Sequence, residues 1–408
     1  MALWVHDATL VDGTGVDPVR TGLLVTDGRV ARIGGERPTD ADVLDAQGQV
    51  VTPGLIDAHV HLALSSDLIA LTSHQLSAAD IAAAIFATAS GTLDSGFTTV
   101  RDCGGIDGGV KNAIAAGRAR GPRVLTSGPI QCQRGGHGHI APVWEPTQMF
   151  CGHAIPGLYD LALLSDNADT MRANVRETFR RGADFIKMCA TGGVVSMHDK
   201  LSDTQLTVAE MAAGVEEARA RGTYVTVHAL NSAGMRNAIE AGVECIEHGA
   251  GLDEETAALM KAKGVALVPT LSVVEALKDN PTESGLDATY VDRATRVFDG
   301  MRDAVEIAHA AGLLVGSGSD LLGPSQLGRA RELVLRSEIL DPMTALVMAT
   351  RNNAKILRID DQVGTLEVGK QADLLLWERD PISDFKVFED RSAVQVVVQR
   401  GNVVRDAR

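Results

Sequence analysis

The sequence predicts an α/β fold: a (β/α)8 TIM-like barrel joined to a small composite β-sandwich domain built from both termini. Two patterns predict it, a repeated helix–glycine–strand unit in the middle of the chain and alternating polar and apolar residues at both ends. A chain of 408 residues, 45% of them hydrophobic, can bury a large core, and one barrel with insertions reaches this length.

The repeated unit is a helix-like stretch, a glycine and a short apolar strand. A glycine just past a helix end takes the left-handed conformation that other residues avoid, and a strand then follows. With a first strand at 50–58, seven units give eight strands, which favours a barrel over an open sheet of six or seven strands. The absence of a GxGxxG motif after the first strand also disfavours the open sheet. The units span 93–100, 119–125, 179–188, 218–227, 239–246, 260–268 and 308–316.

The two ends of the chain carry a different pattern. Turn signals such as LVDGTG and VTDGRV separate alternating segments near the N-terminus, as in short antiparallel strands. The segments GTLEVGKQADLLLW and AVQVVVQRGNVV near the C-terminus are similar. We therefore expect residues 1–56 and 357–408 to form one β domain, and residues 57–356 to form the barrel.

Composition excludes several classes of partner. A formal net charge of −15 without a basic tract argues against nucleic acid, and no apolar run reaches the ~18 residues of a membrane span. The five cysteines form no CxxC pair, and the N-terminus lacks a signal peptide, so we expect a cytoplasmic protein. The expected partner is a small-molecule substrate.

Residues suited to bind metal recur at the ends of the predicted barrel strands, where barrel enzymes place their active sites. In the stretch GLIDAHVHL, His59 and His61 lie on one face of a strand, because strand side chains alternate. Taken singly, each residue has an ordinary explanation, such as a hydrogen-bonded core histidine or a helix cap. Their coincidence at five strand ends favours a metal site. The candidate ligands are His59, His61, Lys187, His228, His248 and Asp320.

Lys187 requires a chemical modification to join such a site. An ammonium group has no lone pair for a metal, and burying it unpaired beside cations is costly. Carbamylation by CO2 would give it a negative charge and two oxygens able to bridge two metal ions. The alternative is a lysine that reaches solvent or pairs with an acid.

These motifs resemble the amidohydrolase superfamily, over nearly the whole chain. They comprise HxH on the first strand, lysine on the fourth, single histidines on the fifth and sixth, and aspartate on the eighth. GGHGH in the loop after the third strand and KMCATGG on the fourth are similar to the prolidase-like group. Those relatives cleave Xaa-Pro, Xaa-Arg or Xaa-Lys dipeptides and N-acyl amino acids, and include ochratoxinase-like amidases and some imidazolonepropionase-like proteins.

The resemblance implies a two-metal hydrolase that cleaves a C–N amide bond. His59, His61 and Asp320 would hold the more buried metal ion, and His228 and His248 the second. N6-carboxylated Lys187 and a hydroxide would bridge the two ions, with zinc the favoured metal. Asp320 would be the catalytic proton carrier. Relatives commonly assemble, so a homo-oligomer is also expected.

Substrate contacts are expected from the long loop after the third strand. His137 would assist catalysis and hold the substrate, together with His139, while Arg134 would pair with a substrate carboxylate. Leu230 occupies a position where relatives often carry a tyrosine or histidine that contacts the substrate, which is a departure from their pattern. The loop also offers three pocket-lining candidates, Trp144, Met149 and Phe150.

Three other functions are alternatives for these residues, and the identity of the ligands does not separate the first of them from an amidohydrolase. A lactonase or esterase could use the same two-metal site. A mononuclear deaminase would need an acid soon after His228, where the sequence is Ala-Leu-Asn-Ser, and would leave Lys187 without a role. A non-catalytic scaffold would be expected to have lost ligands, whereas here the set is complete.

Overall fold

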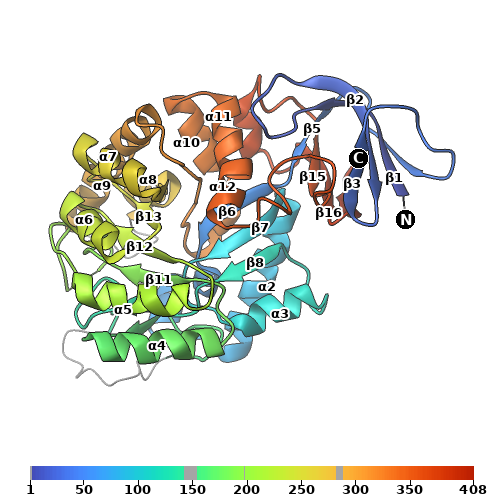
Figure 1. Ribbon diagram of the computed structural model, residues 1–408. Coiled ribbons are helices and arrows are strands. Elements are labelled where there is room, and N and C mark those ends of the chain that lie inside the picture. The colour runs from blue at the N-terminus through green and yellow to red at the C-terminus, as the bar shows by residue number, and fades with distance from the viewer. Residues whose placement is uncertain (1, 142–153, 197, 282–287) are drawn as a thin grey trace.

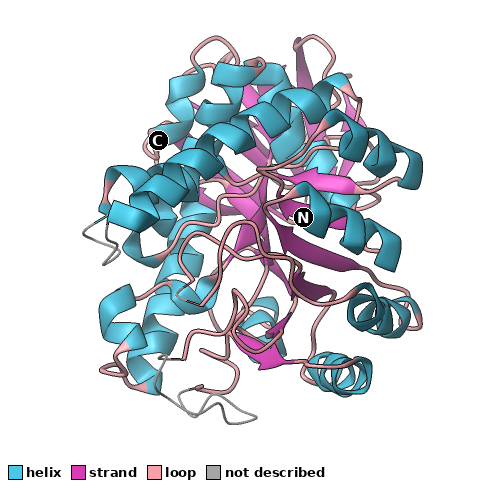
Figure 2. Cartoon of the chain, turned by 90° about the vertical axis from the view of Figure 1, so that its left-hand side faces the viewer, coloured by secondary structure: helices cyan, strands magenta, loops and turns pink. Residues whose placement is uncertain are grey.

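The computed structural model describes residues 2–141, 154–196, 198–281 and 288–408. It is an α/β protein in which parallel strands lie among helices, with a separate mixed sheet at one side (Figure 1). Figure 2 shows the strands in the middle of the molecule and most helices around them. Of the helices in these ranges, none has both the length and the apolar character needed to cross a bilayer.

The mixed sheet joins the two ends of the chain. Its strand order is β17-β16-β15-β5-β1-β2-β3, and β4 pairs with β1. Antiparallel pairing of β15 with β5 places Leu375 opposite Thr52, so C-terminal strands continue the sheet that N-terminal strands begin. The strands are β1 Ala2–Leu10, β2 Val19–Thr26, β3 Arg29–Ile33, β4 Asp42–Asp45, β5 Val50–Pro53, β15 Leu374–Trp377, β16 Val394–Gln399 and β17 Asn402–Asp406.

The parallel strands form two sheets with the orders β6-β7-β8 and β10-β9-β11-β12-β13-β14. All residues of β6, β7, β11, β12 and β13 are buried, as expected for strands covered on both faces. The strands are β6 Leu55–Val60, β7 Phe97–Asp102, β8 Arg123–Thr126, β9 Ile130–Cys132, β10 Ala162–Leu164, β11 Ile186–Cys189, β12 Val225–Ala229, β13 Cys245–His248 and β14 Ala266–Val268.

The predicted eighth strand is shorter than expected. Residues 313–316 form one isolated parallel bridge, between Leu267 and Val315, instead of a full strand. Backbone hydrogen bonds still connect this segment to its neighbours: Gly316 N donates to Leu267 O (2.8 Å) and Ala58 N to Ser317 O (3.0 Å). At the other gap, Asp184 N donates to Thr126 O (2.8 Å), which links β8 to the start of β11.

Helices follow the strands as the glycine pattern predicts. Gly242 and Gly264 end α6 and α7 with φ of 91° and 69°, the left-handed conformation that needs glycine. Gly121, also part of the pattern, does not take this conformation. The helices are α1 Leu68–Thr72, α2 Ala78–Asp94, α3 Gly108–Ala115, α4 Ala168–Arg180, α5 Val208–Arg219, α6 Ser232–Ala241, α7 Glu254–Lys263, α8 Leu271–Asp279, α9 Ala288–Ala310, α10 Arg331–Ile339, α11 Pro342–Val347 and α12 Asn353–Ile356.

Candidate metal centre and substrate pocket

The structure gathers the predicted ligands at the C-terminal ends of the parallel strands. They come from β6, β11, β12 and β13 and from the segment after Val315, elements far apart in the chain. Parallel pairing sets Cys189 opposite His228, and Ala229 opposite His248, so the ends of these strands lie level. All six predicted ligands line one pocket: His59, His61, Lys187, His228, His248 and Asp320.

The donor atoms lie within the range that one or two metal ions can span. His61 Nε2 is 3.3 Å from both His59 Nε2 and Asp320 Oδ1, and His59 Nε2 is 3.6 Å from the same carboxylate oxygen. His248 approaches the other oxygen, with 3.9 Å between its Nδ1 and Asp320 Oδ2. Ligand atoms of His59, His248 and Asp320 all lie within 4.8 Å of one another. The donor set of imidazoles and a carboxylate suits zinc and related divalent ions.

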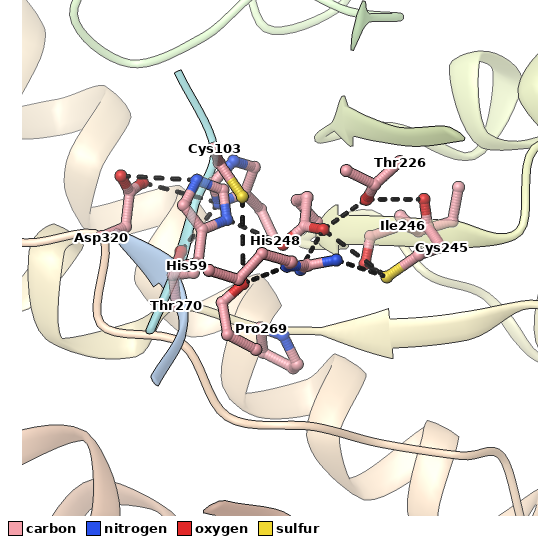
Figure 3. A network of polar contacts seen from close by, with 12 residues as sticks. His59, Cys103, Thr226, Cys245, Ile246, His248, Pro269, Thr270 and Asp320 are labelled. Carbon is pink, nitrogen blue, oxygen red and sulfur yellow. Dashed lines mark hydrogen bonds and ion pairs between the residues drawn. The ribbon is translucent and has the colours of Figure 1, made fainter. Parts of the chain in front are cut away.

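Hydrogen bonds fix the orientation of the imidazole rings. His59 Nδ1 donates to Glu247 Oε2 (2.7 Å), and His61 Nδ1 donates to Gly104 O (3.0 Å), so the Nε2 atoms of both rings face Asp320. Figure 3 shows the contacts of Asp320 and His59 within the surrounding polar network. Such partners select the tautomer of a metal-binding histidine and hold its ring in place.

Burial keeps these imidazoles neutral, the form that binds metal. It lowers the pKa of His61 to about 4, although its hydrogen bond to Gly104 O acts in the opposite direction. Burial also lowers the pKa values of His59, His228 and His248 well below the ordinary value of 6.5, and the Lys187 charge adds to the effect. Burial raises the pKa of Asp320 to about 8.

Lys187 is buried in β11, with 2% of its surface exposed. Among the residues that the structure describes, none forms a hydrogen bond or an ion pair with its side chain, although it lines the pocket beside the imidazoles. An unpaired ammonium in such surroundings carries a large desolvation cost. The structure thus places the Lys187 amine beside the imidazoles without a hydrogen-bond or ion-pair partner among the described residues.

A buried ion pair beneath the centre was missed by the sequence analysis. Glu247, fully buried in β13, accepts hydrogen bonds from His59 Nδ1, from Arg101 Nη2 (2.5 Å) and from the Thr226 hydroxyl. Arg101 is also fully buried, and its Nε donates to Ala58 O (2.5 Å). A charged residue inside the apolar strand VECIEHG was the available signal, because acids are almost never fully buried without a partner.

The pocket above the centre is mostly apolar. The space between its walls, including open solvent at the mouth, is about 840 Å3. Leu230 lies in its wall, together with side chains of α8 and α9. The apolar lining residues are Leu64, Ile130, Ile140, Leu161, Val194, Val195, Leu230, Val273, Val274, Leu277, Val297, Met301 and Leu322.

Of the predicted loop residues that the structure describes, His137 alone lines the pocket. Its ring stacks on His228 with 4.1 Å between centroids, and burial lowers its pKa to about 4. His139 is not in the pocket lining, and its Nδ1 accepts a hydrogen bond from Gly135 N (3.0 Å). Arg134 also lies away from the lining, because Asp166 accepts hydrogen bonds from its backbone N and its Nε. The predicted contacts Trp144, Met149 and Phe150 lie outside the described residues.

His137 is held by a hydrogen-bonded chain from the segment that follows KMCATGG. Its Nδ1 lies 3.0 Å from Ser196 Oγ, and that hydroxyl donates to Asp199 Oδ1 (2.5 Å). With the Ser196 proton directed at Asp199, His137 carries its own proton on Nδ1, so Nε2 presents a lone pair. Gly193 leaves room for the ring, since a Cβ at this position would collide with His137 Cε1.

The fold and the site together define an α/β enzyme of the hydrolase class, and comparison with known proteins gives its family. A family model described as "Amidohydrolase family" matches residues 50–404, so the chain belongs to the amidohydrolase family. Ochratoxinase of Aspergillus niger is 29% identical over 98% of this chain and 86% of that enzyme. The crystal structure of that ochratoxinase has a TM-score of 0.87 and covers 99% of this chain and 96% of its own.

Two further crystal structures support the prolidase-like group. A prolidase complexed with N-methylphosphonate-L-proline is 32% identical, has a TM-score of 0.94 and matches over the full length of both chains. A Xaa-Pro dipeptidase with bound methionine in the active site is 29% identical, with a TM-score of 0.89 over 99% of this chain and 100% of that chain. This chain is therefore a hydrolase acting on carbon–nitrogen bonds, in the prolidase-like group of the family.

Proposed function

We propose that this protein is a metal-dependent amidohydrolase that cleaves an amide bond of a small molecule. The observation that carries this proposal is the convergence of four buried, neutral imidazoles and one carboxylate at the end of the parallel strands. The ligands lie at the bottom of a pocket that opens to solvent, which gives a substrate access to them. The similarity to a prolidase and to an ochratoxinase supports the same reaction.

The residues fit a pair of divalent metal ions, with zinc favoured by the imidazole and carboxylate donors. His59, His61 and Asp320 would hold one ion, and His228 and His248 the other. N6-carboxylated Lys187 would bridge them, which is supported by its burial without a partner among the described residues. When bound, the ions supply an activated water near neutral pH and polarise the carbonyl group.

The reaction adds one water molecule across the C–N bond. The carbonyl carbon gains the hydroxyl group, the C–N bond breaks, and the nitrogen leaves with a proton as an amine. Asp320 is the carrier of that proton, because its carboxylate faces both the imidazoles and the pocket.

His137 is proposed to contact the carbonyl oxygen of the substrate. A hydrogen bond from Nε2 to that oxygen needs a proton on Nε2, which requires the Ser196 hydroxyl to turn from Asp199 toward Nδ1. This rotation exchanges the hydrogen bond from Ser196 to the Asp199 carboxylate for one from Ser196 to His137 Nδ1. His139 and Arg134 are retained only as candidates for contacts at the outer loop, since neither lines the pocket.

The architecture proposed with this function is a closed barrel. Hydrogen bonds at both gaps between the parallel sheets support an eight-stranded ring, completed by the short segment 313–316. We retain the division into a barrel of residues 57–356 and a β domain of residues 1–56 and 357–408. A homo-oligomer in the cytoplasm is likewise proposed; four of the five cysteines are free and buried, which suits a reducing compartment.

Metal analysis combined with a substrate panel tests the function. We expect close to two metal ions per chain, and hydrolysis of amides in preference to lactones and organophosphates. Asp320→Asn should abolish turnover while most of the bound metal is retained. One metal ion per chain would indicate a deaminase-like site instead, and preferred lactone hydrolysis would indicate an esterase. Near-normal turnover by a folded Asp320→Asn variant would refute the role of Asp320 as proton carrier.

A further inference from the structure

We propose that the substrate is an uncharged amide with apolar groups on both sides of the scissile bond, without the free carboxylate of a dipeptide or an N-acyl amino acid. This inference rests on the proposed function and narrows it to one substrate class. It is carried by the composition of the pocket wall and by the pairing of the charged groups around it.

The pocket wall presents hydrocarbon from several elements. Val273, Val274 and Leu277 of α8 and Val297 and Met301 of α9 lie over the metal centre and belong to one buried apolar cluster. This cluster continues to Leu230, where prolidase-like relatives often carry a polar side chain. A wall of this kind recognises apolar groups through the area that it removes from water.

The mouth of the pocket is apolar as well. Ile140 and Val195 line the pocket and are each 39% exposed. Exposed apolar groups beside a cavity are typical of ligand-binding grooves. The entrance therefore favours an apolar molecule before it reaches the centre.

No cation is available for a substrate carboxylate. Among the described lining residues the only lysine or arginine is Lys187, which lies in the proposed metal centre. Two nearby guanidinium groups are already occupied: Arg134 pairs with Asp166, and Arg293 donates to the carbonyl oxygens of residues 196 and 199. The sequence has no lysine or arginine in segments 142–153 and 282–287 or at position 197.

Among the described lining residues, Asp320 is the one acid that could meet a substrate ammonium, and it belongs to the metal centre. A zwitterionic dipeptide would thus bring both of its charges into an apolar wall whose described residues offer no counter-ion. Burying an unpaired ion costs several kcal/mol even after relaxation, which corresponds to at least a ~100-fold loss of kcat/KM.

A matched pair of substrates tests this inference on the metal-loaded enzyme. N-hexanoylpyrrolidine and N-hexanoyl-L-proline share the acyl chain and the tertiary amide and differ only in the carboxylate. We expect kcat/KM to be at least ~100-fold higher for the pyrrolidine amide. Equal values, or a preference for the proline compound, would overturn the inference and leave the amidohydrolase function intact.

Binding of the same pair to the Asp320→Asn variant, measured by titration calorimetry, gives a result that does not depend on turnover. Tighter binding of the pyrrolidine amide supports the inference, and tighter or equal binding of the proline compound overturns it. If the metal-loaded wild type hydrolyses none of the amides in the panel, these two included, the proposed function fails. The binding result still shows which of the two compounds the pocket prefers.

A cation placed at the mouth should reverse the preference. Ile140→Arg should raise kcat/KM for N-hexanoyl-L-proline at least ~10-fold relative to the pyrrolidine amide, because it supplies the missing counter-ion. Ile140→Met is the matched control and should leave the ratio unchanged. Val195→Arg repeats the test from the other exposed side chain, so that poor folding of one variant does not decide the result. An unchanged ratio in both folded arginine variants would contradict the inference.

Discussion

Glu247 offers the sharpest test of how the metal centre is built. Its carboxylate accepts hydrogen bonds from His59 Nδ1 (2.7 Å) and Arg101 Nη2 (2.5 Å), each at a different oxygen. Glu247→Gln keeps the shape of the side chain but replaces one oxygen with an amide N–H2 group. Either His59 or Arg101 would then face a donor in place of an acceptor.

Two separate losses are expected. Breaking a fully buried ion pair by removing one partner typically costs ~3–5 kcal/mol, because Arg101 is left as an uncompensated charge. Loss of the partner that orients a metal-binding histidine typically weakens metal binding ~10–100-fold. We therefore expect the free energy of unfolding of the metal-free protein to fall by ~3 kcal/mol, and metal affinity to fall within that range.

A double variant separates the two losses. In Arg101→Met/Glu247→Gln the unpaired cation is gone, so the free energy of unfolding should recover, whereas His59 remains without its carboxylate and metal affinity stays low. Urea unfolding of the metal-free proteins measures the first quantity, and competition with a chromogenic chelator measures the second. If Glu247→Gln leaves both unchanged, or if the double variant restores metal affinity, the positioning role of Glu247 is refuted.

Three further outcomes follow from the site. Lys187→Ala should reduce bound metal from about two ions per chain to one or none, measured by elemental analysis; two retained ions would refute the bridging carbamate. Gly193→Ala should lower kcat ~10–100-fold with metal content unchanged, because its Cβ displaces the His137 ring, whereas a normal kcat would show that this ring is dispensable. In metal-free protein, stability should decrease as pH falls from 6.5 to about 4, because the unfolded chain then binds five imidazole protons that the folded chain does not. Two carboxyl groups with pKa values raised to about 8 act in the opposite direction but are fewer than the imidazoles, and a flat urea midpoint over this range would refute the assignment of neutral imidazoles to the folded protein. The groups are His59, His61, His137, His228, His248, Asp102 and Asp320.

The sequence predicted the placement of side chains wherever local patterns along the chain determine it. His59 and His61 could be placed on one face because strand side chains alternate, and His228 and His248 could be placed at strand ends because the glycine-marked units repeat. The α/β class and the pairing of both chain ends in one sheet follow from the same local patterns. The proximity of residues far apart in the sequence could thus be predicted from their positions at strand ends, without knowledge of their contacts.

Features that depend on long-range packing were not predictable in this way. The partner of Glu247 is Arg101, which is 146 residues away on another strand, and no local pattern specifies that pairing. Arg134 has the chemistry to bind a carboxylate, but Asp166 occupies it through a contact between two loop segments. The eighth strand is reduced to one bridge because its neighbours, not its own propensity, determine how many residues pair.

The apolar pocket also bears on how products leave. Hydrolysis of an uncharged amide produces a carboxylic acid and an amine, and both are ionised near neutral pH. Away from the metal centre, the described pocket lining offers no counter-ion to either product, so each pays a desolvation cost that the substrate did not. The same wall that binds the neutral substrate therefore disfavours its charged products. Release of the products to water after cleavage is thus favourable in free energy.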